Sequence, residues 1–398
     1  MDQKSQLPAL GYAAFDADHH YYEAEDAFTR HLDRRMRRRA MDWADINGRR
    51  CLLVGGKVNR FIPNPTFDPV AKPGCLDDYF RGRNPENKSI RDLFGDLEPI
   101  HPGYRDRDAR IAQLDAQNVE GCLMFPTLGV GMEEALKEDI PAMLAAFRAF
   151  NRWMNEDWGF AYQNRIFAAP YLLLSDLDWA LEELEWALEQ GARVIVMRAA
   201  PVILKGETIS PADPSLDPFW ARVNEAGITV AYHSGDAGYL DYSAQWGTSD
   251  EFQSFDFNPK SLCMSATPIQ DLCATLVCDG LFDRFSRLRM ATIETGSSWV
   301  PGLMAKFKKA YGQMPMLFQQ DPQEVFRRHF WVSPYYEDDL QGLKDLIGAE
   351  RIIFGSDYPH AEGLSEPTAF VHDLDGFSDD EIRLIMRDNG WSLVQPHN

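Results

Sequence analysis

The segment Phe15–Glu23 carries residues whose types and spacing suit the binding of a divalent cation. In a β-strand, alternate side chains lie on the same face, so Asp18 and His20 point together while His19 points away. Such a pair offers one carboxylate oxygen and one imidazole nitrogen to a single metal ion. Asp16 has the same parity and is expected to support the pair. Alone, this pattern is weak, because polar residues commonly follow a strand.

Two further apolar runs end in a residue that can bind a metal. Residues 228–236 end in His233 followed by Ser-Gly-Asp, and residues 352–360 end in Asp357 followed by Tyr-Pro-His. Each has an ordinary structural explanation, namely a hydrogen-bonded histidine in the first case and a turn or helix-capping aspartate in the second. Considered together, the three segments place two aspartates and two histidines directly at the ends of predicted strands.

These runs belong to a series of eight short β-branched or apolar segments, the number that a (β/α)8 barrel requires. The candidate strands are Ala14–His20, Val119–Phe125, Ile166–Pro170, Val194–Arg198, Ile228–His233, Leu288–Glu294, Phe330–Ser333 and Ile352–Ser356. Helical patterns at Asp178–Gln190 and Pro218–Ala226 are each followed by a glycine and a strand, as in repeated β/α units. The predicted fold class is therefore α/β, a (β/α)8 TIM barrel in which residues 1–398 form one domain.

Two stretches exceed what a plain barrel of about 250 residues needs. Residues 48–108 are rich in Gly, Pro, Asn and Arg and are expected to form an irregular insertion after strand one. Residues 236–262 follow strand five and carry six aromatic residues with little periodicity. Insertions after barrel strands lie on the catalytic face, so both are expected to line an active site. A contact between the subunits of a dimer is the alternative.

The composition argues against several classes of protein. The chain has 40 Lys and Arg against 61 Asp and Glu, and its net charge of -21 disfavours nucleic acid or an anionic membrane as the main partner. The first residues lack an apolar signal segment, and no run of 18 apolar residues suggests a membrane span. The six cysteines form no Cys-x-x-Cys pair, which favours the cytoplasm. The basic tract Arg34–Arg39 is interpreted as a solvated or interface helix face.

With these segments in this order, the sequence resembles the amidohydrolase superfamily. The resemblance is to the amidohydrolase-2 branch, which includes aminocarboxymuconate-semialdehyde decarboxylase and γ-resorcylate decarboxylase. It runs from Asp16 to beyond His360, and its most specific matches are AYHSGD at 231–236 and GSDYPH at 355–360. It implies a mononuclear metal site on a TIM barrel. The ligands carried over from the family pattern are Asp18, His20, His233 and Asp357.

The sequence departs from the family pattern at two positions. Asp18 stands where many relatives have histidine, and a second carboxylate among the ligands suits Mn²⁺ or Zn²⁺. Glu294 ends strand six where many relatives have a proton-handling histidine. A carboxylate beside a metal ion is a competent base, so Glu294 is a candidate catalytic residue together with His233 and Asp357. A structural or metal-binding role for Glu294 is the alternative.

Two residues are predicted to contact the substrate. Arg198 ends strand four, and its guanidinium could bind a substrate carboxylate through two hydrogen bonds. The alternative is a salt bridge to a strand-end carboxylate such as Glu294. His360 follows Asp357 by three residues and is expected to face the substrate.

The predicted function is that of a metal-dependent enzyme, a decarboxylase or hydrolase of a small aromatic or unsaturated carboxylic acid. Its cofactor is expected to be one divalent ion, Zn or Mn. The family further predicts a homo-oligomer, most simply a dimer. The alternative is a non-catalytic or metal-poor barrel that binds a small ligand. The departures at Asp18 and Glu294 keep this alternative open, because a fold does not determine the reaction.

Overall fold

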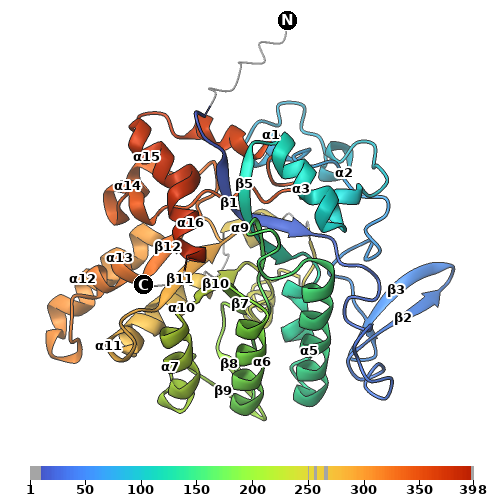
Figure 1. The fold of residues 1–398 in the computed structure, drawn as a ribbon, viewed down its shortest axis with the longest axis horizontal. Coiled ribbons are helices and arrows are strands. Elements are labelled where there is room, and N and C mark those ends of the chain that lie inside the picture. Colours follow the sequence, from blue (N-terminus) through green and yellow to red (C-terminus); the bar gives the residue numbers. More distant parts are fainter. Residues whose placement is uncertain (1–9, 250, 255–257, 264–267, 396–398) are drawn as a thin grey trace, which may run out of the picture.

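The computed structural model describes residues 10–249, 251–254, 258–263 and 268–395. In it, parallel strands lie at the centre and helices pack outside them (Figure 1). The barrel strands are β1 (Ala14–Tyr21), β5 (Val119–Pro126), β6 (Ile166–Ala168), β7 (Val194–Arg198), β10 (Thr229–His233), β11 (Arg289–Ile293) and β12 (Phe330–Val332). Each begins within one residue of its predicted start. Because helices cover them, all their residues are buried except Glu120 of β5, which is half-buried.

The strands are joined into a closed ring. One parallel sheet has the order β1-β5-β6 and the other β12-β11-β10-β7. A parallel bridge between Tyr171 and Val196 connects β6 to β7, and a bridge between His19 and Tyr358 connects the first strand to the last segment. The predicted (β/α)8 TIM barrel is confirmed.

The eighth predicted strand, Ile352–Ser356, is extended but does not form a regular ladder. Ile353 N donates to Val332 O at 3.0 Å, whereas Phe354 N donates outward to Ile385 O at 3.1 Å. Ser356 N donates to the side chain of Asp16 at 3.0 Å. The segment closes the barrel, but two of its amides bond outside the sheet, and this interrupts the strand.

Helices follow the strands around the outside. Their bounds are α3 (Arg107–Ala116), α5 (Ile140–Asp157), α6 (Leu177–Glu189), α7 (Asp217–Ala226), α10 (Pro268–Cys278), α11 (Leu281–Arg284), α12 (Val300–Gln313), α13 (Pro322–His329), α14 (Leu340–Ile347), α15 (Asp379–Arg383) and α16 (Asn389–Val394). Helix α6 begins one residue before its predicted start because the Asp176 side chain accepts a hydrogen bond from Trp179 N. Helix α7 ends at Gly227, whose φ of 62° is the left-handed conformation of a terminating glycine.

The long segment between β1 and α3 contains regular structure that its composition did not predict. Strands β2 (Met41–Ile46), β3 (Arg49–Val54) and β4 (Lys57–Val58) form an antiparallel sheet that projects from the barrel (Figure 1). Two short helices follow, α1 (Asp77–Phe80) and α2 (Ile90–Leu93). The basic tract before β2 forms turns, which corrects the predicted helix face. There Arg35 pairs with Asp33, and Arg39 pairs with Asp139 at the start of α5.

The loops after β5 and β10 lie at the C-terminal ends of the barrel strands. Helix α4 (Met132–Ala135) follows β5, and helices α8 (Leu240–Ala244) and α9 (Pro259–Cys263) lie in the insertion after β10. Part of that predicted insertion, at 250 and 255–257, lies outside the described residues. Between β7 and α7, strands β8 (Val202–Leu204) and β9 (Glu207–Ile209) form a small hairpin. In the described part of the chain, no helix has the length and apolar character needed to span a bilayer.

Candidate metal centre

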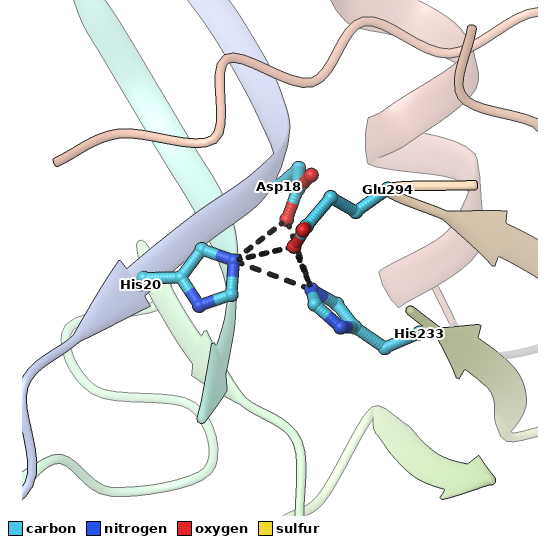
Figure 2. A group of neighbouring side chains, drawn as sticks. All are labelled: Asp18, His20, His233 and Glu294. Atoms are coloured by element: carbon cyan, nitrogen blue, oxygen red, sulfur yellow. Dashed lines mark hydrogen bonds and ion pairs between the residues drawn. The ribbon is translucent and has the colours of Figure 1, made fainter. Parts of the chain in front are cut away.

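Four side chains from three strands converge at the C-terminal ends of the barrel (Figure 2): Asp18 and His20 on β1, His233 at the end of β10, and Glu294 directly after β11. His20 Nε2 lies 3.3 Å from Asp18 Oδ1 and 3.2 Å from His233 Nε2. Glu294 Oε2 lies 3.1 Å from His233 Nε2 and 3.4 Å from His20 Nε2. One ligand atom from each residue lies within 4.8 Å of the others. Two imidazole nitrogens and two carboxylate oxygens are thus directed at one point.

The fourth predicted ligand, Asp357, lies on the adjacent side of His20. Its Oδ1 is 3.3 Å from His20 Nε2 and 2.5 Å from His360 Nδ1. His20, Glu294, Asp357 and His360 form a second group of ligand atoms within 4.8 Å of one another. The structure therefore brings Asp18, His20 and His233 into one group and Asp357 into an adjacent one, and His20 and Glu294 belong to both groups.

Glu294 and Asp357 have an unusual backbone conformation. Their φ angles are 51° and 57°, in the left-handed region that residues with a Cβ rarely occupy. Each follows the last residue of a buried strand or extended segment, so the left-handed turn redirects its side chain toward His20. Such conformations cost about 1–3 kcal/mol each and persist where the surrounding structure enforces them, often at functional sites.

A buried network behind the cluster fixes the ends of β1 and of the last segment. Asp16 Oδ1 accepts from Asp18 N at 3.1 Å and from Ser356 N at 3.0 Å. Asp16 Oδ2 lies 3.0 Å from His19 Nε2, and His19 Nδ1 lies 3.0 Å from Arg110 Nη1. Arg110 is fully buried and also donates to His20 O at 2.8 Å. The expectation that Asp16 supports the Asp18–His20 pair stands on these contacts.

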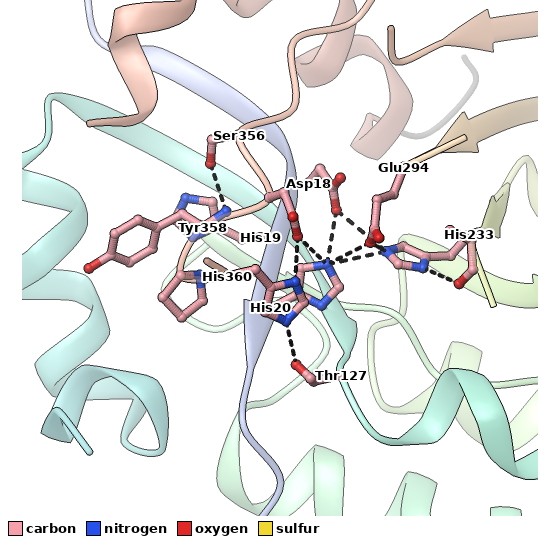
Figure 3. Close-up of polar contacts among 12 residues, drawn as sticks. Asp18, His19, His20, Thr127, His233, Glu294, Ser356, Tyr358 and His360 are labelled. Atoms are coloured by element: carbon pink, nitrogen blue, oxygen red, sulfur yellow. Dashed lines mark hydrogen bonds and ion pairs between the residues drawn. The ribbon is translucent and has the colours of Figure 1, made fainter. Parts of the chain in front are cut away.

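The hydrogen bonds of His360 determine where its protons lie. Thr127 Oγ1 donates to Tyr21 O at 2.8 Å, so its single hydrogen is used. Thr127 Oγ1 must then accept from His360 Nε2, which lies 2.9 Å away (Figure 3). On the other side of the ring, a nitrogen lone pair and a carboxylate oxygen would repel each other at 2.5 Å. One proton is therefore shared between His360 Nδ1 and Asp357 Oδ1.

The electrostatics of the cluster reflect crowded, buried carboxylates. Burial disfavours the charged form of His233, but Glu294 and Asp18 outweigh it and raise the pKa of His233 from 6.5 to about 10. Burial and the nearby Glu294 raise the pKa of Asp357 well above its ordinary value. Asp18 Oδ1 is buried and, among the described residues, has no hydrogen-bond donor with good geometry. Such a set of buried nitrogen and carboxylate oxygen atoms fits a divalent cation.

A cavity of about 1210 Å³ opens above the cluster. Asp18, His20, His233, Glu294 and Asp357 form part of its lining.

Two predicted substrate contacts, His360 and Arg198, also line this cavity. Arg198 is paired with Glu134 and lies 3.4 Å from Glu133 Oε1, so the acidic partner expected for it is found on α4 and not at Glu294.

Sequence reasoning missed three residues that hold the site. Thr127 follows the predicted strand Val119–Phe125 and one proline. At the other strand ends, a polar residue after an apolar run is interpreted as a candidate site residue. The same rule would have identified Thr127. Glu133 and Arg110 had no such signal. Arg110 lies on a helix with mixed polarity, and a buried arginine there cannot be distinguished from an exposed one in a single sequence.

The strands form a closed parallel barrel, and a histidine–carboxylate cluster lies at their C-terminal ends. The protein is therefore a TIM barrel with a candidate metal centre. The chain belongs to the amidohydrolase family, whose model matches residues 95–390. That match includes His233, Glu294 and Asp357 but begins after β1. The resemblance to the amidohydrolase-2 branch is confirmed.

Individual relatives agree with this assignment. A solved amidohydrolase from Mycobacterium avium subsp. paratuberculosis K-10 is 44% identical with a TM-score of 0.93, and the match covers 98% of this chain and 99% of that chain. A dihydroxybenzoic acid decarboxylase from Polaromonas sp. JS666, solved with manganese and 2-nitroresorcinol, shares the fold at 16% identity and a TM-score of 0.56, covering 84% of this chain and 95% of that chain.

A third relative is the 2-amino-3-carboxymuconate-6-semialdehyde decarboxylase of Dictyostelium discoideum. It is 23% identical over 188 residues, which are 46% of this chain. The match spans 49% of that relative, about half of its length.

Proposed function

We propose that this protein is a metal-dependent enzyme that removes CO₂ from an aromatic or unsaturated carboxylic acid. The observation that carries the proposal is the convergence of Asp18, His20, His233 and Glu294 at the floor of a cavity. Two of the relatives are named as decarboxylases of such acids, and the structure of one was solved with manganese. The metal-poor binding barrel is disfavoured, because the cluster keeps a full set of ligand atoms.

The residues present fit a divalent ion. Nitrogen from two histidines with oxygen from carboxylates is a donor set that binds Mn²⁺ or Zn²⁺, and a larger share of carboxylate favours Mn²⁺. Asp18, His20, His233 and Asp357 would hold the ion, and Glu294 lies close enough to join them. A cation bound there supplies positive charge that orients and polarises the carboxylate of a substrate.

Decarboxylation also needs a proton donor, and His360 is the residue proposed for this role. Decarboxylation leaves an electron pair on carbon, and that carbon must receive a proton. His360 lines the cavity and holds a proton between its Nδ1 and Asp357 Oδ1, while Thr127 fixes the ring through Nε2. We assign to His360 the transfer of this proton to the carbon. General acid catalysis of this kind contributes about 10²–10⁴-fold to a rate.

The test is CO₂ release from a panel of hydroxybenzoates and unsaturated acids. The manganese-loaded protein should release CO₂ from at least one of them, and chelation should stop the reaction until Mn²⁺ is returned. His360→Gln should lower kcat at least about 100-fold with the metal content retained. The exposed variant Asp375→Asn serves as the control. If no acid in the panel loses CO₂, the decarboxylase proposal fails.

Hydrolysis is the second candidate, and the position of Glu294 favours it. Its Oε2 lies at the centre of the cluster, 3.1 Å from His233 Nε2, and the residue lines the cavity. A carboxylate there can take the proton of an attacking water molecule. The same panel, extended with acids that carry an amide or lactone bond and analysed for products that have gained water, separates the two reactions. Hydrolysis products without CO₂, lost in Glu294→Gln, would favour the hydrolase.

Two expectations about the cellular form belong to the same proposal. All six cysteines are free thiols in the structure, which supports a reducing compartment such as the cytoplasm. The homodimer predicted from the family resemblance stays a prediction, and light scattering of the purified protein measures it directly.

A further inference from the structure

The cavity above the metal centre is much larger than a single substituted ring. Its volume is about 1210 Å³. An apolar cavity of about 150 Å³ accommodates benzene, and pockets for drug-sized ligands span roughly 300–1,000 Å³. A monocyclic acid bound at the metal would thus leave most of this space to water. The volume fits a substrate that continues well beyond its acid group.

A row of aromatic rings leads from the metal centre into this space. The ring centroids of His20 and His360 are 4.0 Å apart, and those of His360 and Tyr22 are 5.8 Å apart. Tyr22 in turn stacks on Phe67 at 4.8 Å. Tyr22, Phe67 and His360 all line the cavity, so aromatic rings form part of this wall. Aromatic surfaces of this kind pack against rings and alkyl groups.

A second part of the wall is also aromatic. Phe61, from the insertion after β1, stacks on Phe252, from the insertion after β10, with centroids 4.5 Å apart. Both residues line the cavity. The stack joins the two insertions above the barrel, and Gly131 packs so closely beneath it that an added Cβ would lie 2.9 Å from the Phe61 ring. The two rings therefore have a fixed place in the wall.

The charges of the wall disfavour a second acidic group on the substrate. Among the described lining residues outside the metal centre and His360, Arg91 and Arg198 are the only basic ones. The Arg198 side chain is 6% exposed and is already paired with Glu134 and Glu133. Arg91 is exposed on the short helix α2, away from the buried floor. Carboxylates of the remaining wall would repel an anion held beyond the metal centre. These are Glu337, Asp338 and Glu362.

We propose that the substrate is an extended monoacid: its carboxylate occupies the metal centre, and an uncharged extension of at least one further ring lies along the aromatic wall. The proposal rests on the proposed function for the placement of the acid group. It names the size and charge of the rest of the molecule.

The test compares binding of three probes to the manganese-loaded protein by calorimetry. The probes are 2-hydroxybenzoate, 3-hydroxybiphenyl-4-carboxylate and 3-hydroxybiphenyl-4,4′-dicarboxylate. The added phenyl ring should tighten Kd at least tenfold, and the second carboxylate should remove that gain. If the biphenyl acid binds no tighter than 2-hydroxybenzoate, or the dicarboxylate binds equally well, the proposal is overturned. It is also overturned if none of the three binds.

Because this readout is binding, it is separate from turnover. Tight binding of the biphenyl acid without CO₂ release would support the extended cavity while the decarboxylase proposal fails. If small acids release CO₂ but the second ring does not tighten binding, the decarboxylase proposal is supported and the extended-monoacid proposal fails.

A variant locates the binding of the extension. Phe61→Ala should lower the ratio of biphenyl to monocyclic affinity at least fivefold. Leu317→Ala, which changes an exposed residue outside the cavity lining, should leave the ratio unchanged. Phe252→Leu removes the other ring of the stack with less loss of volume, so it provides the same test if the first variant folds poorly. An unchanged ratio in a folded Phe61 or Phe252 variant contradicts the proposal.

Discussion

The substitution Asp16→Asn changes one atom of the network that fixes the metal-binding strand ends. Asp16 Oδ1 accepts from the backbone of Asp18 and of Ser356, and asparagine keeps this acceptor. Asp16 Oδ2 faces His19 Nε2 at 3.0 Å, and asparagine places an NH₂ group there. The change is therefore confined to the contact between residue 16 and His19.

The tautomer of His19 sets the size of the effect. The guanidinium of Arg110 only donates, so His19 Nδ1 must accept and Nε2 must carry the hydrogen. Burial also lowers the pKa of His19, which keeps the ring neutral. In the variant, two donors face each other at residue 16. Moving the hydrogen to Nδ1 only transfers the conflict to Arg110. Replacing the close contact with a charged carboxylate by two buried donors that face each other costs about 3 kcal/mol.

Urea unfolding of the metal-free protein measures this cost. Asp16→Asn should lower the free energy of unfolding by about 3 kcal/mol. The exposed variant Asp375→Asn should change stability by less than about 0.5 kcal/mol. A loss below about 1 kcal/mol in Asp16→Asn would refute the assignment of protons in this network.

Three further predictions address packing, metal binding and the His360 ring. Gly390→Ala places a Cβ 2.5 Å from the Phe15 ring and should destabilise the fold by about 1–3 kcal/mol. The measurement is a lower Tm, and an unchanged Tm would contradict the tight packing. His233→Ala should retain the native circular dichroism spectrum but bind less than half an equivalent of Mn²⁺ by elemental analysis, so full occupancy would remove His233 from the ligands. Thr127→Val removes the acceptor of His360 Nε2 and should lower kcat about tenfold with unchanged metal content. An unchanged kcat would show that Thr127 does not position the His360 ring.

The strand ends could be predicted from the sequence because each is a local pattern. An apolar run followed by His233 or by Asp357 is visible in a few residues, and the barrel geometry then requires such ends to meet. The same reasoning placed Glu294 at the site but could not distinguish a ligand from a base, because that depends on distances of a few tenths of an ångström.

The partners of Arg198 and the structure of the first insertion could not be predicted. Arg198 pairs with Glu133 and Glu134, which lie 64 residues or more away on a four-residue helix, and nothing local in the sequence marks that contact. Strands β2 (MDWADI) and β3 (RRCLLV) are six residues each, and neither alternates apolar and polar residues regularly, so the hairpin could not be separated from the surrounding loop.

The bond between Asp16 and Ser356 joins residues 340 positions apart. Contacts between such distant positions form late, because a long loop must close before they are gained. On a ribosome, the end of β1 with Asp18 and His20 is made first and cannot meet Asp357 until nearly the whole chain has been synthesised. Metal capture by this protein is therefore a reporter of completed folding, and in refolding experiments it should lag behind the recovery of helical signal.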